Sequence, residues 1–433
     1  MSFVVALLLG LSALSSVGCG QDSRRSFADE GEEYLQIHVL APRFPAAVDS
    51  EHWGFHSRFT RDWQPQPEDS RFFVYQARSA WTAAFVGRLR PGRASSLGAA
   101  ARAGLVAIRR FRDTDHGGFF TRVDLEARPI GSTSKATHVQ AFGLLALSEL
   151  ARFERLEPAE RDYAARAARE TFDWIESHAA IPGGGYRSAL ARDGSPLPFD
   201  AAAVAPPRDG LGVPAAWQDA GTALHLLEAY AALLRIAPGD AVVRARVEAL
   251  VQRLLGPFWS EPGCLHGALD ASGRPVPGRV SLGHNVEAAA LLLEAVETLG
   301  RPRDPRSVAA AQRLVDYTLH WGFDRERGAW ATWAPGVLAR PRDAAVGFWV
   351  PFEAIHALAR LHLVVGDAPA RYGAPLEATW RFLREHMTDD REHGFWEGLD
   401  GGGRPIERKS WDWTDPYHAA RALVVAADVL GAS

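Results

Sequence analysis

The chain has 433 residues, of which 47% are hydrophobic and 23% are charged, and its formal net charge is -4 at pH 7. This is the composition of a globular protein, and it excludes an intrinsically disordered or collagen-like chain. The near-neutral charge and the lack of a basic run argue against a nucleic-acid partner. Two cysteines cannot build a disulfide framework.

The N-terminal residues are typical of a targeting signal. Residues 1–18 are almost entirely apolar or small, and their hydrophobic core is shorter than the roughly 20 residues that a membrane span needs. The core ends at Ser16-Val17-Gly18-Cys19, which resembles a bacterial lipobox. We therefore expect a signal peptide over 1–18, a lipidated Cys19 and a linker over 19–25. This predicts an exported lipoprotein that contacts the membrane only through its lipid, with plain secretion as the alternative.

The body of the chain repeats a glycine/aromatic loop five times. The lead glycines are 67, 79, 65 and 66 residues apart, at Gly117, Gly184, Gly263, Gly328 and Gly394. Two helical patterns lie between consecutive loops. A period near 65 residues that contains two helices and a turn predicts an array of helical hairpins.

The spacing of apolar residues predicts eleven helices, and a twelfth within 27–50. The eleven are expected at 72–88, 95–111, 134–153, 158–178, 219–236, 241–256, 284–299, 306–320, 344–364, 373–387 and 416–430. Twelve helices in six hairpins indicate an all-α fold, a single (α/α)6 barrel over residues 26–433 with short glycine/aromatic loops. An open solenoid is the alternative.

The two rings of such a barrel differ in composition. Helices 95–111, 158–178 and 241–256 carry many Arg and Glu, as outer helices that face solvent do. Helices rich in Ala and Leu with few charges are expected to be buried in the inner ring, and these are 134–153, 219–236, 284–299 and 416–430.

Ionisable residues stand near the start of each predicted inner helix. They are Arg78, within the first helix, and then His138, His225, His284, Glu353 and His418. Because every second helix is inner, the inner helices run parallel and these side chains should meet at one mouth of the barrel. Helix N-termini there favour oxygen-rich or anionic ligands. The structural alternatives are satisfied core histidines, and a salt bridge from Arg78 to Glu353 or to an outer helix.

Six tryptophans are candidates for a sugar-stacking surface, and we expect two or three of them to serve as one. They are Trp81, Trp217, Trp321, Trp349, Trp396 and Trp411. The two His-x-x-Glu patterns, His225/Glu228 and His284/Glu287, reverse the Glu-x-x-His order of di-iron bundles, and HExxH is lacking. We therefore expect no catalytic metal, and the sequence lacks the glycine-rich motifs that bind phosphate or dinucleotide cofactors.

Seven short motifs occur in order along the chain: Gln76-Ala77-Arg78, Gly117-Gly118-Phe119, Gln140-Ala141-Phe142, Leu224-His225-Leu226-Leu227-Glu228, Gly283-His284-Asn285-Val286-Glu287, Trp349 with Glu353, and Pro416-Tyr417-His418. Together they resemble the N-acylglucosamine 2-epimerase family, which includes cellobiose 2-epimerases and mannose isomerases. The resemblance covers roughly residues 50–430. It implies an (α/α)6 barrel without a metal that interconverts sugars at C2 or between C1 and C2.

The resemblance also implies roles for individual residues. His284 and His418 match the two acid/base histidines of the family. His225 matches a third histidine that contacts the sugar near its reacting carbons, and Arg78 matches the arginine that holds sugar oxygens. Glu287 matches a carboxylate that orients the neighbouring histidine. We expect the substrate-binding residues to be His138, Glu353, Trp349 and Trp411.

Two positions depart from the family pattern. His138 stands where the family often has Tyr, and Gly221 stands where cellobiose epimerases commonly have Asn. Both lie at the expected mouth of the barrel. They leave the reaction class intact and the identity of the sugar open.

Histidine suits this chemistry because its unperturbed pKa of about 6.5 lets one side chain take a proton and another give one near neutral pH. Two histidines on opposite faces of C2 would epimerise an open-chain aldose or the reducing end of a disaccharide. One histidine that serves both C1 and C2 would interconvert aldose and ketose, and Arg78 would stabilise the enediolate oxygen in either case.

Two other functions remain open from the sequence alone. A glycoside hydrolase or lyase on the same fold needs two carboxylates about 5 to 9.5 Å apart. The candidates are Asp115, Asp219, Glu353 and Asp415. A non-catalytic sugar-binding lipoprotein is the second alternative. The sequence makes no prediction of the oligomeric state.

Overall fold

A computed structural model describes residues 27–198, 207–343, 345–366 and 369–431 of the chain. The predicted signal peptide over 1–18, the lipidation site at Cys19 and the linker over 19–25 lie outside these residues. Within the described residues, no helix is long and apolar enough to cross a membrane.

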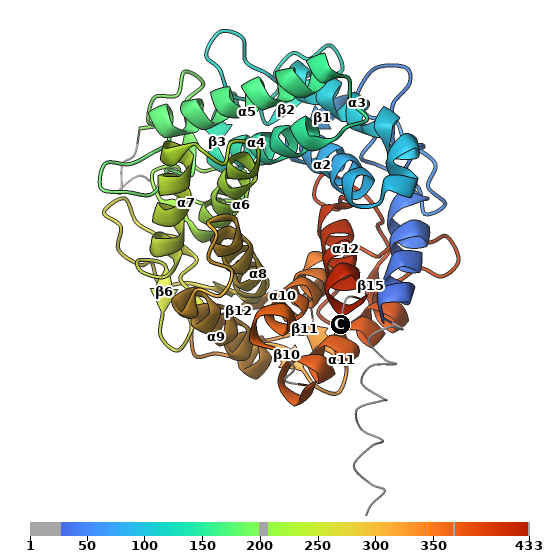
Figure 1. The fold of residues 1–433 in the computed structure, drawn as a ribbon, viewed down its shortest axis with the longest axis vertical. Coiled ribbons are helices and arrows are strands. Elements are labelled where there is room, and N and C mark those ends of the chain that lie inside the picture. Colours follow the sequence, from blue (N-terminus) through green and yellow to red (C-terminus); the bar gives the residue numbers. More distant parts are fainter. Residues whose placement is uncertain (1–26, 199–206, 344, 367–368, 432–433) are drawn as a thin grey trace, which may run out of the picture.

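Six helices form an inner ring (Figure 1). They are α2 (Phe73–Leu89), α4 (Thr137–Arg152), α6 (Ala220–Ile236), α8 (Leu282–Thr298), α10 (Trp349–Val365) and α12 (Tyr417–Gly431). Each of these helices packs on the next, and α12 packs on α2. The ring is therefore closed, which confirms the barrel and excludes the open solenoid.

The outer ring alternates with the inner one along the chain (Figure 1). It contains α3 (Ala94–Arg110), α5 (Pro158–His178), α7 (Ala241–Leu254), α9 (Pro305–Trp321) and α11 (Ala374–Phe382), which continues as η4 (Leu383–Met387). The short turns η2 (Pro91–Arg93) and η3 (Pro369–Gly373) precede α3 and α11. The predicted twelfth helix is residues 27–34, which continue as η1 (Leu35–Leu40) against α12.

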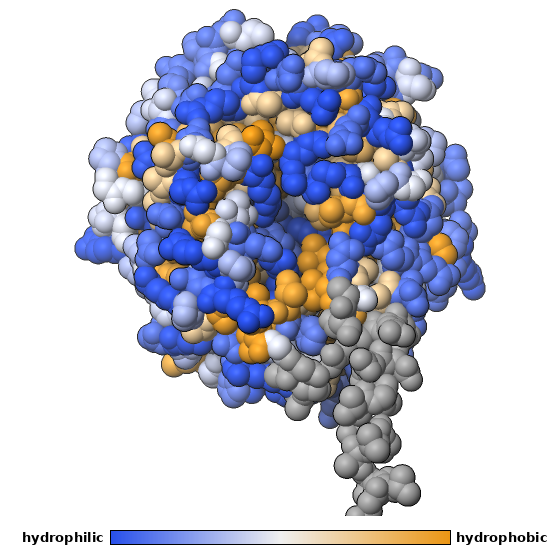
Figure 2. Space-filling view, in the orientation of Figure 1, coloured by the Kyte–Doolittle hydropathy of each residue, from blue (hydrophilic) through white to orange (hydrophobic). Residues whose placement is uncertain are grey.

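Burial separates the two rings as their composition predicts. In α6, all fifteen residues from Ala220 to Leu234 are buried, whereas α5 buries only the stripe of small and apolar residues that faces inward. Removing a Leu side chain from water contributes about 1.5–3 kcal/mol, so the Ala- and Leu-rich helices gain most from the central position. The surface in Figure 2 is hydrophilic over most of its area, and apolar residues gather around its centre.

Short antiparallel strands join neighbouring loops at the N-terminal ends of the inner helices. The pairs are β1 (Ser70–Phe72) with β2 (Arg122–Asp124), β3 (Lys135–Ala136) with β4 (Ala189–Leu190), β5 (Gln218–Asp219) with β8 (Ala268–Leu269), β9 (Val280–Ser281) with β12 (Trp333–Ala334), and β13 (Val346–Gly347) with β14 (Gly398–Leu399), which also pairs with β15 (Pro405–Ile406). Residues 346–347 were predicted to begin a helix. They pair with β14 instead, and α10 starts at Trp349.

Two glycine/aromatic loops form the hairpins that the sequence suggested. They are β6 (Trp259–Ser260) with β7 (Cys264–Leu265), and β10 (Phe323–Asp324) with β11 (Ala329–Trp330). Other loops of this kind are held by a side chain of the inner helix that follows. Gln76 accepts a hydrogen bond from the Phe55 amide at 2.7 Å and donates one to its carbonyl at 2.8 Å. Gln140 binds both backbone groups of Phe119 in the same way. These glutamines therefore hold loops in place through their side-chain amides.

Candidate active site

Five of the six ionisable residues predicted to converge line one cavity of about 530 Å³, and Glu353 lies behind it. Its lining includes Arg78, His138, His225, His284, Glu287, His418 and Trp349. These side chains come from all the inner helices, and each lies within the first few turns of its helix. The predicted site is therefore a single pocket at the mouth of the barrel. A groove of about 630 Å³ between α7 and residues 180–186 has no histidine among its described lining residues.

Three histidines and a tryptophan form the floor of this cavity. The ring centres of His284 and His418 lie 5.3 and 5.6 Å from the ring centre of Trp349. The ring centre of His225 lies 6.5 Å from that of His284. A ligand that rests on Trp349 is therefore within reach of the two histidines predicted to exchange protons.

His418 is oriented by Glu353, which was predicted to bind substrate. Nδ1 of His418 lies 2.5 Å from Oε1 of Glu353, so Nε2 is the ring nitrogen available to a ligand. Burial alone would raise the pKa of Glu353, but Arg421, with His356 and His418, holds it well below its usual value. Glu353 is fully buried and is not among the described residues that line the cavity. Its contact is with His418, behind the cavity wall.

A buried arginine joins the carboxylates behind the histidines. Nη2 of Arg421 lies 3.0 Å from Oε1 of Glu287 and 2.7 Å from Oε1 of Glu353, and Nη1 donates to Glu228. Glu228 in turn lies 3.7 Å from Nδ1 of His225. The sequence prediction missed Arg421. The signal was a lone arginine one turn after His418, in a helix that is otherwise apolar up to Asp428.

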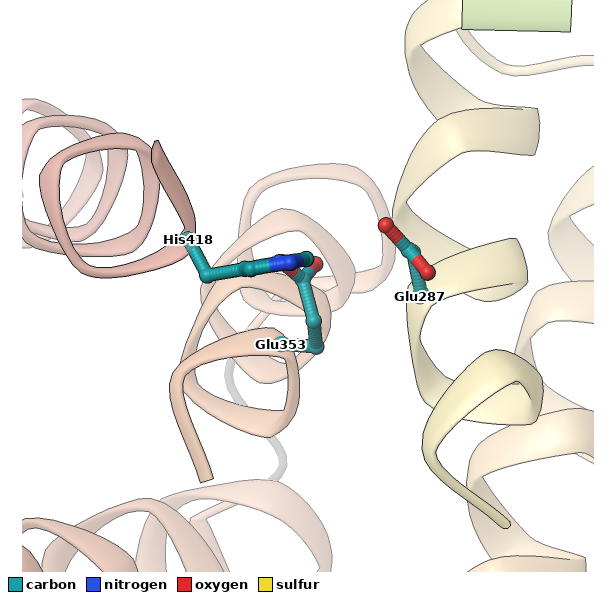
Figure 3. Close-up of side chains that lie close together, drawn as sticks. All are labelled: Glu287, Glu353 and His418. Carbon is teal, nitrogen blue, oxygen red and sulfur yellow. The ribbon is translucent and has the colours of Figure 1, made fainter. Parts of the chain in front are cut away.

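The same carboxylates resemble a metal site. Ligand atoms of Glu287, Glu353 and His418 lie within 4.8 Å of one another. In Figure 3, His418 points towards Glu353, and Glu287 faces both from α8. However, the guanidinium of Arg421 binds both carboxylates and supplies the positive charge that a metal would bring. The donor set therefore fits an arginine-centred ion cluster.

His284 is held by the start of its helix. Its backbone amide donates to Oγ of Ser281, the N-cap of α8, at 3.1 Å. Burial lowers the pKa of His284, and the negative charges of Glu287 and Asp219 offset this in part. A neutral imidazole at pH 7 can accept a proton from a substrate.

His138 faces the cavity without a partner. Its side chain is 1% exposed, and neither ring nitrogen has a hydrogen-bond partner among the described residues. Burial, followed by the charges of His225 and Arg78, lowers its pKa to about 3. A buried polar group of this kind usually binds water or a ligand. His138 therefore offers one donor and one acceptor to whatever fills the cavity.

Arg78 forms a buried salt bridge, which the sequence offered as the alternative to a sugar-binding role, but its partner is not the one expected. Nη1 of Arg78 lies 3.1 Å from Oδ2 of the buried Asp415, and not next to Glu353 as the sequence suggested. The guanidinium carbon lies 4.2 Å from the ring centre of Phe142. Arg78 still lines the cavity, so Asp415 and Phe142 hold it ready for an oxygen ligand.

The tryptophans of the site are only partly those expected. Trp217 and Trp349 line the cavity, together with Trp333 and Trp413, which the sequence prediction missed. Trp411 is not among the described lining residues. Its ring lies against the guanidinium of Arg408, at 4.3 Å. Which of two tryptophans in one loop turns inward depends on that loop's path, and helical periodicity carries no information on it.

The carboxylates proposed for glycoside hydrolysis are dispersed. Of the four candidates, Asp219 alone is among the described residues that line the cavity, where it also caps α6 by accepting from the Thr222 amide at 2.7 Å. Asp415 is bound to Arg78, and Asp115 pairs with Arg192 on the surface. Of these four candidates, one therefore lines the cavity among the described residues, whereas hydrolysis needs a pair of carboxylates that flank the substrate.

A family model for N-acylglucosamine 2-epimerase matches residues 54–198 and 270–422, which is more than half of the chain. The chain belongs to the N-acylglucosamine 2-epimerase family. It is a sugar epimerase or isomerase on an (α/α)6 barrel. The motifs that indicated this from the sequence are those that line the cavity or hold its residues in place.

Individual relatives agree with this assignment. Cellobiose 2-epimerase from Bacteroides fragilis is 27% identical over 405 residues, 91% of this chain and 97% of the relative. The structure of cellobiose 2-epimerase from Spirochaeta thermophila has a TM-score of 0.81 and 25% identity, covering 95% of this chain and 98% of that one. A D-mannose isomerase shares the fold, with a TM-score of 0.74 at 18% identity, covering 98% of this chain and 100% of that one.

Proposed function

We propose that this chain epimerises the reducing end of a disaccharide, or a free aldose, at C2. The observation that carries the proposal is that His284 on α8 and His418 on α12 line one cavity, each within 5.6 Å of Trp349. Two separate bases around one sugar suit proton exchange on both faces of a carbon. The relatives named as cellobiose 2-epimerases support this choice.

The reaction requires the open-chain aldehyde. One histidine takes the proton from C2, the C–H electron pair forms a C1–C2 double bond, and the carbonyl oxygen becomes an enediolate oxygen. Arg78, held by Asp415, is placed to stabilise that negative charge. The second histidine then gives a proton to the opposite face of C2 and restores the aldehyde. Such acid–base steps each contribute about 10²–10⁴-fold to the rate.

The mouth of the cavity supports a substrate larger than one sugar ring. Two of its lining residues are large and apolar yet open to solvent, Leu211 at 46% and Trp333 at 41% exposure. Arg279 lies over the Trp333 ring at 4.5 Å and holds it in place. Exposed apolar surface beside a pocket marks a binding surface. A second sugar ring would cover it.

Proton NMR in deuterium oxide tests the proposed reaction. The wild-type chain, incubated with cellobiose, N-acetylglucosamine, glucose and mannose, should place deuterium at C2 of at least one sugar and yield its C2 epimer. His284→Gln and His418→Gln should each abolish this exchange, whereas His320→Gln, on the exposed side of α9, should not. A ketose product would show isomerisation instead, and binding without exchange would show a sugar-binding protein.

We also propose that the chain is exported and anchored by lipid on Cys19. The support is the sequence of residues 1–19, an apolar core followed by a lipobox-like ending. Expression in a bacterium with labelled palmitate should yield a labelled, membrane-associated protein. Cys19→Ser should release it from the membrane fraction. Unlabelled wild-type protein in the soluble fraction would contradict the proposal.

A further inference from the structure

A fifth histidine lies behind the four that line the cavity. His356 on α10 is fully buried, one helical turn after Glu353, and is not among the described residues that line the cavity. Its Nε2 lies 2.9 Å from Oε1 of Glu294 on α8. Its Nδ1 lies 3.6 Å from Oε2 of Glu353. The ring is therefore placed between two carboxylates, and the chemistry described above does not use it.

The protonation of His356 follows from what its two nitrogens face. A neutral imidazole has one donor and one acceptor, so one nitrogen would present a lone pair to a carboxylate. Nδ1 of His356 and Oε2 of Glu353 have no hydrogen-bond partner among the described residues, and they face each other. When both nitrogens carry a proton, the ring is positively charged, and each N–H faces a carboxylate oxygen that attracts it.

The surrounding charges favour this imidazolium. Burial alone lowers the pKa of His356, but Glu294 on α8 and Glu353 on α10 outweigh burial and raise it above 6.5. Arg421 on α12 opposes them. Its guanidinium is itself bound by Glu228, Glu287 and Glu353, so the buried cluster holds more carboxylates than arginines.

We propose that His356 is a positioning residue which, as an imidazolium between Glu294 and Glu353, fixes the carboxylate that orients His418. Oε1 of Glu353 binds His418 and Arg421, and His356 is the charged group that faces Oε2. With both oxygens held, Glu353 keeps a single orientation, and so does the His418 ring. The inference rests on the proposed acid/base role of His418.

This role predicts a particular pattern of kinetic change. His356 does not touch the substrate, so its loss should lower kcat and leave KM nearly unchanged. Deprotonation at high pH has the same effect as its loss, because Oε2 of Glu353 then faces a lone pair. The wild-type kcat should therefore fall at alkaline pH, where His356 loses its proton. Removing the negative charge of Glu294 should make this fall begin at a lower pH.

Two variants and one control test this pattern. His356→Gln should lower kcat about tenfold or more with KM within about twofold of wild type, as losing a group that orients a reacting side chain does. Glu294→Gln should keep kcat near the wild-type value at acidic pH. The decrease of kcat at alkaline pH should begin at a lower pH in this variant than in wild type. His320→Gln should match wild type. Wild-type kcat and pH profile in His356→Gln would overturn the proposal.

Nitrogen-15 NMR of the histidines in the full chain separates this inference from the proposed function. The His356 signals, identified by their loss in His356→Gln, should report protons on both nitrogens at pH 7, and a neutral ring would overturn the proposal. If wild type exchanges no sugar, the proposed function fails. The inference about His356 is then tested by the His418 Nδ1 signal alone. That signal should shift in His356→Gln, and an unchanged signal would overturn the inference.

Discussion

Nδ1 of His418 lies 2.5 Å from Oε1 of Glu353, although 65 residues separate them in the chain. The two side chains come from adjacent inner helices, α12 and α10, and Glu353 has no exposed surface. A buried, ionised carboxylate selects the tautomer of the histidine that leaves Nε2 for the substrate. The relationship suits His418 to the acid/base role that we propose for it.

Glu353→Gln should lower kcat by about 10- to 100-fold with little change in KM, because the amide neither selects this tautomer reliably nor stabilises a charged His418. Steady-state kinetics on the sugar identified by NMR checks this. Glu154→Gln, an exposed glutamate at the end of the α4–α5 hairpin, is the control and should leave kcat unchanged. Equal kcat in both variants would show that Glu353 has no part in orienting His418.

Gly221→Ala should also reduce activity. A Cβ at this position would lie 2.9 Å from Cε1 of His284 and 3.1 Å from Oδ2 of Asp219, so His284 must move. A displacement of about 1 Å at a reacting group costs on the order of 10²-fold in rate. Gly239→Ala, whose Cβ would meet nothing within 4 Å, is the control for both kinetics and stability. A fully active Gly221→Ala enzyme would contradict this prediction, because it would show that the reaction does not depend on the present position of the His284 ring.

The chain's only two lysines, Lys135 and Lys409, should matter for stability. Nζ of Lys135 lies 3.0 Å from Oδ2 of Asp113, and Nζ of Lys409 lies 2.8 Å from Oδ2 of Asp389. All four side chains are buried. Replacing either lysine by Met leaves a buried carboxylate short of one partner and should lower the free energy of unfolding by about 3 kcal/mol, measured in urea. Arg128→Gln is the control, because Arg128 belongs to an exposed ion pair, and it should leave the midpoint of urea unfolding unchanged.

His138 should make the fold sensitive to acid. Its folded-state pKa of about 3 lies below the unfolded value of 6.5, so the unfolded chain takes up this proton first as pH falls. Stability is therefore lost from about pH 6.5 downward, by about 1.4 kcal/mol per pH unit. Between pH 7 and pH 5, the free energy of unfolding of His138→Phe, measured in urea, should fall by about 2 kcal/mol less than that of wild type. Parallel stability curves for the two proteins would contradict the assignment.

Chelation should leave the enzyme active. The guanidinium of Arg421 binds both Glu287 and Glu353, so the carboxylates closest to His418 already have a positive partner. Dialysis against EDTA should change neither kcat nor the melting temperature. Loss of activity that added divalent metal restores would show that Glu287, Glu353 and His418 hold an ion.

Much of this molecule follows from patterns that are local in sequence. The 3.6-residue spacing of apolar residues identified each helix, and the lack of charge identified the inner ones, because a helix that is apolar on all sides must be buried. The 65-residue period implied that inner helices run parallel. The positions of His225, His284 and His418 near helix starts then followed, together with their meeting at one mouth.

Contacts between distant parts of the chain were decided by the tertiary structure alone. Arg78 pairs with Asp415, 337 residues away, and Arg421 reaches Glu228 and Glu287 across the barrel. Closing the ring brings α12 against α2, and only then do these charges share a buried site where each needs a partner. The paths of the loops were also decided by the tertiary structure. Trp413 lines the cavity, whereas Trp411, two residues earlier in the same loop, is not among its described lining residues. Periodicity describes one helix at a time, whereas pairing of buried charges depends on the closed ring.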